Sequence, residues 1–318
     1  MGLAATLAIT GAAYLHPRST VIRTAEVAAV QSGGLTQTRA SADQQPVVLA
    51  RTVEATKQID GPVDLILWPE KRGQSGPYLA METAEEIVSR TAIERQATVL
   101  PGWFFPVNDR TATVNFQTAV WPDGQTRDRY DKVRTVPFGE FVPLRPLIEK
   151  FSGEIPAADV IQGTAPPVLD TPVGKVGVAI SWEGFFENRS RDAIENGAEL
   201  LTNPTNGSSY WLTQVHTQQV ASNQLRALEF DRWVVMAAPT GLSAIISPNG
   251  NVQQRSDIGT RDVLQATVEM RRGKTLGALV GFWPVVLYTL AAAVWSFTRK
   301  RPAPLGGVQS GSEGVAAQ

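Results

Sequence analysis

Three short segments combine reactive side chains with residues that would hold them in place. Glu70 closes a Leu-Trp-Pro-Glu segment, Lys132 and Glu140 share a loop rich in proline and aromatic residues, and Ser181 ends an apolar run. A carboxylate, an ammonium group and a hydroxyl are the groups that covalent catalysis uses as general base, oxyanion partner and nucleophile. We therefore expect a catalytic site if the fold brings the three segments together.

Trp182 and Glu183 follow Ser181 directly, before a helix that is expected to begin near residue 187. A sharp turn from strand to helix exposes its first side chain and leaves the next backbone N–H groups free to face a substrate. Such N–H groups stabilise developing negative charge. Ser181 is therefore a candidate nucleophile, and the backbone N–H groups that follow it are candidate donors to an oxyanion.

Each segment also has an ordinary structural explanation when it is taken alone. Glu70 could be a solvated residue after a strand, and Lys132 with Glu140 could be a surface ion pair. Ser181 could cap the following helix or lie buried as a structural hydroxyl. Only the combination of the segments favours catalysis over these explanations.

Four further residues are candidates for a substrate pocket. Trp68 lies two positions before Glu70, and the other three follow a predicted strand in a polar and aromatic loop: Asn206, Tyr210 and Trp211. Residues of these types are also common in turns and plain packing, which is the alternative explanation.

Short apolar runs alternate with helical stretches between residues 24 and 270, which favours an α/β or layered α+β domain. The reactive segments fall at or just after predicted strands, where α/β folds gather their active sites. Helices are predicted where apolar residues recur at three- and four-residue spacing, at residues 47–59, 82–95, 188–197 and 214–230. Strands are predicted at residues 25–30, 63–68, 97–103, 115–121, 176–181, 199–202, 233–238, 242–247 and 263–268.

The two ends of the chain differ from this domain. Residues 276–297 are 22 consecutive uncharged, mostly apolar residues, which predicts a C-terminal transmembrane helix. Residues 298–318 are rich in Gly, Ser, Pro and Ala, and we expect them to be a disordered tail. Residues 1–23 contain a shorter uncharged stretch, which we interpret as a partial membrane segment with a linker.

The composition argues against several classes of function. Among 318 residues, 29 Lys and Arg balance 30 Asp and Glu, so the basic surplus typical of nucleic-acid binding is missing. The chain has no cysteine, and its two histidines, His16 and His216, are far apart in sequence. Because disulfides and most zinc sites need these residues, we expect no metal and no cofactor, and no nucleic-acid partner.

In their order along the chain, the three segments resemble the Glu, Lys, Cys constellation of the nitrilase (carbon-nitrogen hydrolase) superfamily. Within it, the chain is similar to the apolipoprotein N-acyltransferases through Trp-Pro-Glu at residues 68–70, Lys132 and Val-Pro-Phe-Gly-Glu at residues 136–140. Asn-Pro-Thr-Asn at residues 203–206 adds to the similarity. The resemblance implies a nitrilase-type α-β-β-α four-layer sandwich over residues 24–270.

The resemblance also implies a role for each candidate residue. Glu70 would be the general base, and Lys132 with the backbone N–H of Trp182 would stabilise the oxyanion. Glu140 and Glu183 would support this centre.

Ser181 falls where these enzymes carry a cysteine. The implied activity is transfer of an acyl chain from a phospholipid, through an acyl-enzyme, to the N-terminal amine of a lipoprotein diacylglyceryl-cysteine. Because a hydroxyl is far less acidic than a thiol, two alternatives stay open. One is a catalytically inactive nitrilase-fold protein that binds lipoprotein, lipid or a partner membrane protein, and the other is a membrane-tethered amidohydrolase.

The resemblance further implies where the protein acts and with what. The domain would lie at the cell membrane on its exocytoplasmic side, with a phospholipid as acyl donor and a lipoprotein as acceptor. Enzymes of this family carry several membrane helices before the catalytic domain. A separate membrane subunit that supplies such helices is therefore a further expected partner.

Overall fold

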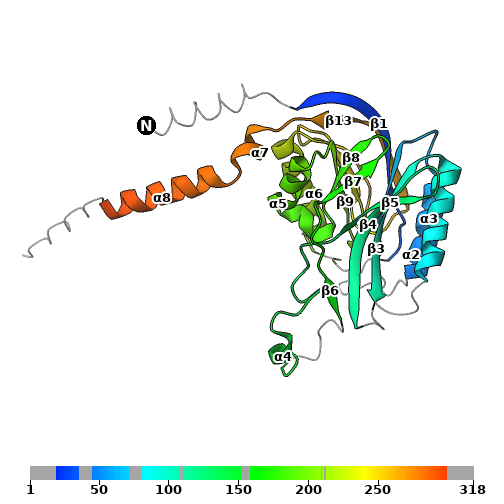
Figure 1. Ribbon diagram of the computed structural model, residues 1–318, viewed down its shortest axis with the longest axis horizontal. Helices are drawn as coiled ribbons and strands as arrows, with labels where there is room; N and C mark the ends of the chain where they lie inside the picture. The colour runs from blue at the N-terminus through cyan, green and yellow to red at the C-terminus, as the bar shows by residue number, and fades with distance from the viewer. Residues whose placement is uncertain are drawn as a thin grey trace, which may run out of the picture. The chain divides into compact units, whose positions relative to one another are not determined.

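The computed structural model describes residues 19–35, 45–71, 80–107, 111–151, 158–208, 210 and 213–298. The chain divides into a large unit, Met1–Leu279, and a second unit, Val280–Gln318. Two β-sheets lie face to face in the large unit, with helices on the outer face of each (Figure 1).

The first sheet holds seven strands among the described residues, in the order β13-β1-β2-β3-β4-β5 with β6 beside β4. Strands β1, β2 and β3 run parallel, and the path continues antiparallel to β4 and β5. Glu70 lies near the end of β2, and Lys132 directly follows β5. The bounds are β1 Thr20–Gln31, β2 Leu65–Lys71, β3 Thr98–Val107, β4 Ala112–Val120, β5 Thr126–Asp131, β6 Asp159–Ile161 and β13 Asp262–Arg272.

The second sheet holds six strands among the described residues, in the order β12-β11-β10-β9-β8-β7. Its central strands β8, β9 and β10 are parallel, so their carboxyl ends meet at one edge of the sheet. Ser181 and Thr205 follow the ends of β8 and β9 at this edge. The bounds are β7 Val168–Thr171, β8 Gly174–Val178, β9 Leu200–Pro204, β10 Val234–Ala237, β11 Ala244–Ile246 and β12 Val252–Arg255.

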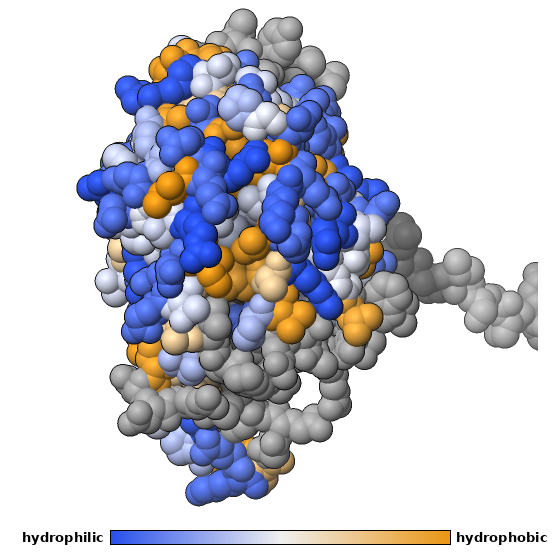
Figure 2. Space-filling model, turned by 90° about the vertical axis from the view of Figure 1, so that its right-hand side faces the viewer, coloured by the Kyte–Doolittle hydropathy of each residue, from blue (hydrophilic) through white to orange (hydrophobic). Residues whose placement is uncertain are grey.

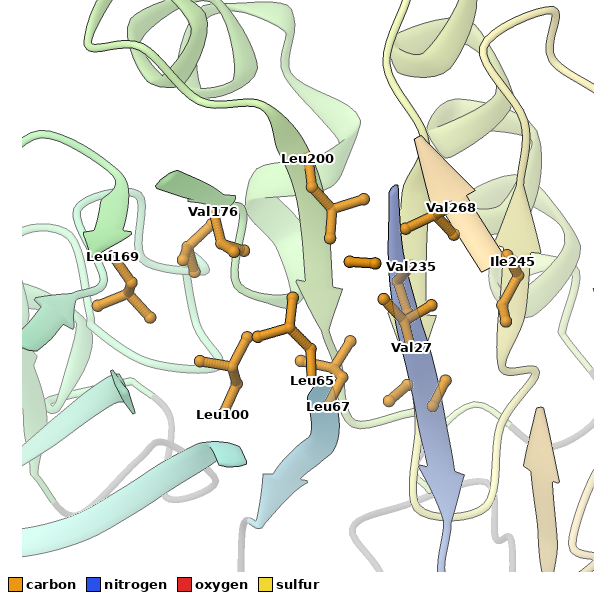
Figure 3. Close-up of a cluster of buried hydrophobic side chains, with 14 of the residues drawn as sticks. Val27, Leu65, Leu67, Leu100, Leu169, Val176, Leu200, Val235, Ile245 and Val268 are labelled. Atoms are coloured by element: carbon orange, nitrogen blue, oxygen red, sulfur yellow. The ribbon is translucent and has the colours of Figure 1, made fainter. Parts of the chain in front are cut away.

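An apolar core fills the space between the two sheets (Figure 3). Because side chains alternate across a strand, Leu65 and Leu67 of β2 point into this core, while Ile66 and Trp68 point to the helices outside. Each fully buried Leu or Val contributes about 1.5–3 kcal/mol relative to an exposed one.

Helices α2 (Gln45–Thr56) and α3 (Met81–Arg95) cover the first sheet through a second apolar cluster. Helices α5 (Glu187–Glu195) and α6 (Val215–Phe230) cover the second sheet through a third. The solvent side of the α2 and α3 layer is mainly hydrophilic, with small apolar areas between the polar residues (Figure 2). These layers confirm the predicted α-β-β-α sandwich.

The C-terminal apolar segment forms two helices, α7 (Leu276–Val280) and α8 (Trp283–Thr298). Gly281 has a φ of 54° and ends the first helix, while Pro284 lies in the first turn of the second. The prediction of one continuous helix over residues 276–297 is therefore wrong. Within the ranges that the structure describes, no helix is both long and apolar enough to cross a membrane.

Two predictions concern residues that the structure does not describe. Most of the expected N-terminal membrane segment, residues 1–18, lies outside the described residues, as does nearly all of the expected tail, residues 299–318.

A short helix, α4 (Arg145–Ile148), completes the large unit and lies in the long connection between β5 and β6.

Candidate active site

Glu70 is 2% exposed, near the end of β2. Its Oε1 accepts a hydrogen bond from the Asn115 side chain at 3.0 Å, and its backbone N–H donates to the Thr205 carbonyl at 3.3 Å. A Cβ atom on Gly102 would lie 2.9 Å from the Glu70 Cα, so only glycine allows β3 to approach so closely. Glu70 is thus joined to β4 of its own sheet and to the residue that follows β9 of the second sheet.

Lys132 and Glu140 form a buried ion pair with 2.8 Å between Nζ and Oε1. Asn115 donates to the same carboxylate oxygen at 3.3 Å and so bridges Glu140 and Glu70. The backbone N–H of Val136 donates to the other oxygen of Glu140 at 2.9 Å. A proline-rich loop thereby fixes the carboxylate that orients the lysine.

The charge of Lys132 is stabilised by its surroundings. Burial favours the neutral amine, but the carboxylates of Glu140 and Glu70 outweigh burial, and the pKa of Lys132 is raised. Lys132 is therefore an ammonium group at neutral pH. A fixed cation in a buried site is the type of group that stabilises an oxyanion.

Glu183 is fully buried and connects the lysine loop to the turn that carries Ser181. Its Oε1 accepts hydrogen bonds from the Tyr130 hydroxyl and from the backbone N–H groups of Val133 and Arg134, at 2.9–3.0 Å. Its Oε2 accepts from the backbone N–H of Ile180 at 2.9 Å. Burial raises the pKa of Glu183, although these donors and the charge of Lys132 oppose the shift.

Ser181 opens a 3-10 turn, Ser181–Phe185, three residues beyond the end of β8. Its φ of 50° places it in the left-handed region. The side chains of Gln219 and Asn203 donate to its carbonyl oxygen at 3.1 and 3.3 Å and hold this conformation. The predicted strand at residues 176–181 is therefore too long, and a strand-to-helix elbow carries the serine.

Thr205 connects Ser181 to Glu70. Its hydroxyl lies 3.3 Å from Ser181 Oγ, and its carbonyl accepts the Glu70 backbone N–H. The structure therefore brings Glu70, Lys132 and Ser181 to one edge of the sandwich through their shared neighbours.

The pocket candidates are placed differently. Trp68 is fully buried in the core beneath α2, where its Nε1 donates to Thr56 at 3.0 Å, so it does not line a pocket. Asn206 accepts hydrogen bonds from Ser208 in a tight turn. The Tyr210 ring packs edge-on against His216, with centroids 6.4 Å apart. Trp211 lies outside the described residues.

Sequence reasoning missed several polar residues that hold the site together: Asn115, Tyr130, Thr205 and Gln219. Asn115 and Thr205 are each about 1% exposed beside apolar strands. A buried polar residue needs a hydrogen-bond partner, so Asn115 inside a predicted strand was an available signal, whereas Thr205 lies in a polar segment that gives none. No group of His, Asp or Glu placed to hold a metal ion occurs in the described part of the chain.

Comparison with known proteins identifies a family and a fold. The model of the carbon-nitrogen hydrolase family matches residues 26–276. Yeast Nit3, a member of branch 10 of the nitrilase superfamily, superimposes with a TM-score of 0.57 at 17% identity. The superposition covers 89% of this chain and 99% of Nit3, so the two proteins share a fold.

Two relatives are apolipoprotein N-acyltransferases. The protein from Mycolicibacterium smegmatis is 31% identical over 198 residues, which cover 60% of this chain and 33% of that protein. The protein from Synechocystis is 35% identical over 179 residues, which cover 54% and 34%. The matched part of this chain thus spans about a third of the length of these two relatives.

Proposed function

Because the chain belongs to the carbon-nitrogen hydrolase family, we propose that it is an acyltransferase of the apolipoprotein N-acyltransferase type with Ser181 as its nucleophile. One observation carries this proposal. Asn115 joins the Glu70 carboxylate to the buried Lys132–Glu140 pair. Removing one partner of a buried ion pair costs about 3–5 kcal/mol, because the other charge is left buried without compensation. Clusters of buried charged groups are typical of catalytic sites.

In the first step, the Ser181 hydroxyl attacks an ester carbonyl of the phospholipid and transfers its proton to Glu70. The carbonyl oxygen becomes an oxyanion, which Lys132 and the backbone N–H of Trp182 stabilise. The carbon–oxygen bond to glycerol then breaks. The leaving lysophospholipid oxygen takes the proton from Glu70, and the acyl chain remains on Ser181 as an ester.

In the second step, the free amine of the lipoprotein diacylglyceryl-cysteine attacks the acyl-serine. Glu70 accepts a proton from the amine and returns it to Ser181 Oγ as the ester bond breaks. The products are an N-acylated lipoprotein and the free serine. The acyl ester is energetically able to drive formation of the more stable amide.

Intact-mass spectrometry after incubation with phospholipid tests this proposal. The expected result is a mass increase of one acyl chain that is absent in Ser181→Ala and persists in the control Ser89→Ala, on α3. Ser181→Cys is expected to form the adduct faster, because a nearby base converts a thiol to its anion more readily. If Ser181→Cys acylates and the natural protein does not, the turnover proposal fails.

A second function is favoured by the chemistry of Ser181 itself. No histidine in the described part of the chain forms a hydrogen bond with Ser181, and serine hydrolases normally use such a base. The protein would then bind lipid or lipoprotein without turnover. Binding of a synthetic diacylated lipopeptide with no adduct supports this function, whereas release of ammonia from small amides supports a membrane-tethered amidohydrolase.

Membrane attachment is part of the proposal and is supported by α8. Among its 16 residues none is charged and none is buried, and Trp295 and Phe297 are 58% and 89% exposed. An exposed apolar surface of this extent favours a lipid environment. Co-sedimentation with liposomes, lost when Leu287→Lys and Leu290→Lys are combined, tests this attachment.

The proposed orientation places the catalytic domain on the exocytoplasmic side. Because the chain has no cysteine, one introduced cysteine is the only thiol of this chain that can react, and its labelling is measured after the protein is purified. Glu195→Cys at the exposed end of α5 is expected to react with a membrane-impermeant maleimide in intact cells or spheroplasts. The same cells would show whether a separate membrane subunit co-purifies with the domain.

A further inference from the structure

A cleft of about 480 Å³ lies between the lysine loop and the start of α5. Val133, Arg134 and Thr135 line it from the loop, and Trp182 and Phe186 line it from the elbow. Trp182 directly follows Ser181 in the chain, and Val133 directly follows Lys132. The reaction proposed above gives this cleft no role.

Two arginines bring positive charge to the cleft. Arg134 lies over the Phe186 ring, with its Cζ 3.9 Å from the ring centroid, and no carboxylate of the described residues forms an ion pair with it. Arg189, also on the cleft wall, is paired with Asp192. The lining therefore carries one net positive charge, and the planar guanidinium of Arg134 is held by its stacking.

The amino end of α5 adds to this charge. Phe186 is the N-cap residue and provides no side-chain hydrogen bond to the first turn. The unpaired N–H groups of a helix start carry a partial positive charge and bind anions readily. Phe186, Asn188 and Arg189 place this first turn on the cleft wall.

We propose that this cleft binds the phosphodiester of the acyl donor, with Arg134 as its main ligand. A guanidinium fork can bind two oxygens of an anionic phosphodiester, whereas a neutral ester offers it no charged pair of oxygens. The Trp182 and Phe186 rings, 5.1 Å apart between centroids, give the glycerol next to the phosphate an apolar wall. This assignment rests on the proposed function and names the part of the donor that the site recognises.

The position of Trp182 explains why the phosphate matters for transfer. Because Trp182 directly follows Ser181, a phosphate held beside Arg134 would bring the glycerol esters to the elbow that carries the nucleophile. Binding energy from a group that does not react then orients the carbonyl that does. Arg134 is therefore a binding residue, and its loss weakens donor binding and transfer together.

Calorimetric titration with two short-chain lipids tests the assignment. Dihexanoylphosphatidylglycerol contains the phosphodiester, and dihexanoylglycerol lacks it. Arg134→Gln is expected to bind the phospholipid at least about tenfold more weakly, because a hydrogen bond to a charged group is lost, and to bind the neutral lipid unchanged. Arg90→Gln, an exposed arginine paired with Glu86 on α3, is the matched control.

Two more variants separate charge from folding. Arg134→Lys keeps the charge without the planar fork and is expected to retain part of the affinity. Asp192→Asn removes the partner of Arg189 and is expected to tighten phospholipid binding. Inorganic phosphate is expected to compete with the phospholipid and not with the neutral lipid, which distinguishes binding of the phosphate from binding of the chains.

Equal binding of the two lipids, no binding of either, or an equal loss for both lipids in Arg134→Gln would overturn the assignment. The titrations are repeated in Ser181→Ala, which cannot be acylated. Phosphate-dependent binding without acylation of the natural protein leaves the cleft assignment standing and removes the proposed turnover. If acylation is unchanged in Arg134→Gln and does not depend on the phosphate of the donor, the proposed turnover stands and the cleft assignment fails.

Discussion

The hydroxyl of Tyr130 donates a 2.9 Å hydrogen bond to Glu183, across the boundary between the two sheets. Tyr130 belongs to β5, two residues before Lys132, and Glu183 lies two residues after Ser181. The separation between the lysine and the serine is therefore set by a carboxylate that forms a hydrogen bond with neither side chain. Glu183 is a positioning residue.

Glu183→Gln should destabilise the fold by about 1–3 kcal/mol. The glutamine amide would place an N–H donor where one carboxylate oxygen now accepts hydrogen bonds from backbone N–H groups. Tyr130→Phe, which removes only one of the donors, should cost about 1 kcal/mol. Urea denaturation measures both. Glu195→Gln, which changes an exposed carboxylate at the end of α5, is the control, and an equal effect there would contradict the positioning role.

Lys132→Met should reduce stability by about 3–5 kcal/mol, because it leaves the Glu140 carboxylate buried without its cation. Adding Glu140→Gln to Lys132→Met should cost much less than the sum of the single substitutions. A double-mutant cycle by chemical denaturation checks this coupling. Strictly additive losses would show that the 2.8 Å contact contributes little.

Thr205→Val should slow reaction of Ser181 with a fluorophosphonate by about tenfold, because the hydroxyl beside Ser181 Oγ is lost. Thr202→Val is the matched control, since Thr202 lies on β9, three residues before Thr205, and makes a buried hydrogen bond to the Gly177 carbonyl. Both substitutions should reduce stability by about 1 kcal/mol. Labelling followed by mass spectrometry gives the rates, and equal slowing in both variants would count against a specific role.

His216 should make the fold less stable in mild acid. Burial lowers its pKa from the ordinary 6.5, so the unfolded chain takes up the proton first. Stability is thus fully present above about pH 6.5 and declines as the pH falls towards the lower folded pKa, by at most about 1.4 kcal/mol per pH unit. His216→Gln should flatten the curve of unfolding free energy between pH 7 and 5. An unchanged slope would assign the decline to carboxyl groups.

The central elements of the fold could be predicted from the sequence because they are apolar on at least one face. Four helices were placed within a few residues of α2, α3, α5 and α6, and the inner strands were found at their positions. Strands β5, β6, β7 and β12 were missed. β5 reads Thr-Arg-Asp-Arg-Tyr-Asp and is largely exposed at the sheet edge, so no apolar alternation marks it.

The candidate site was predictable only in part. Glu70, Lys132 and Ser181 each follow a strand, and strand ends that share an edge explain why residues so far apart in sequence come close. The side on which Trp68 faces was not predictable, because a buried strand is apolar on both faces. Asn115 and Thr205 were missed because their partners lie far away in the sequence, on strands, loops and a helix, and come close only when the two sheets pack.

The left-handed conformation of Ser181 has a consequence for how this chain balances folding against reactivity. A non-glycine residue at a φ of 50° costs on the order of 1 kcal/mol, and glycine would adopt the same turn freely. Ser181→Gly should therefore raise the melting temperature while removing the hydroxyl. Glycine would give the more stable fold at this position. The Ser181 side chain therefore lowers the stability of the domain.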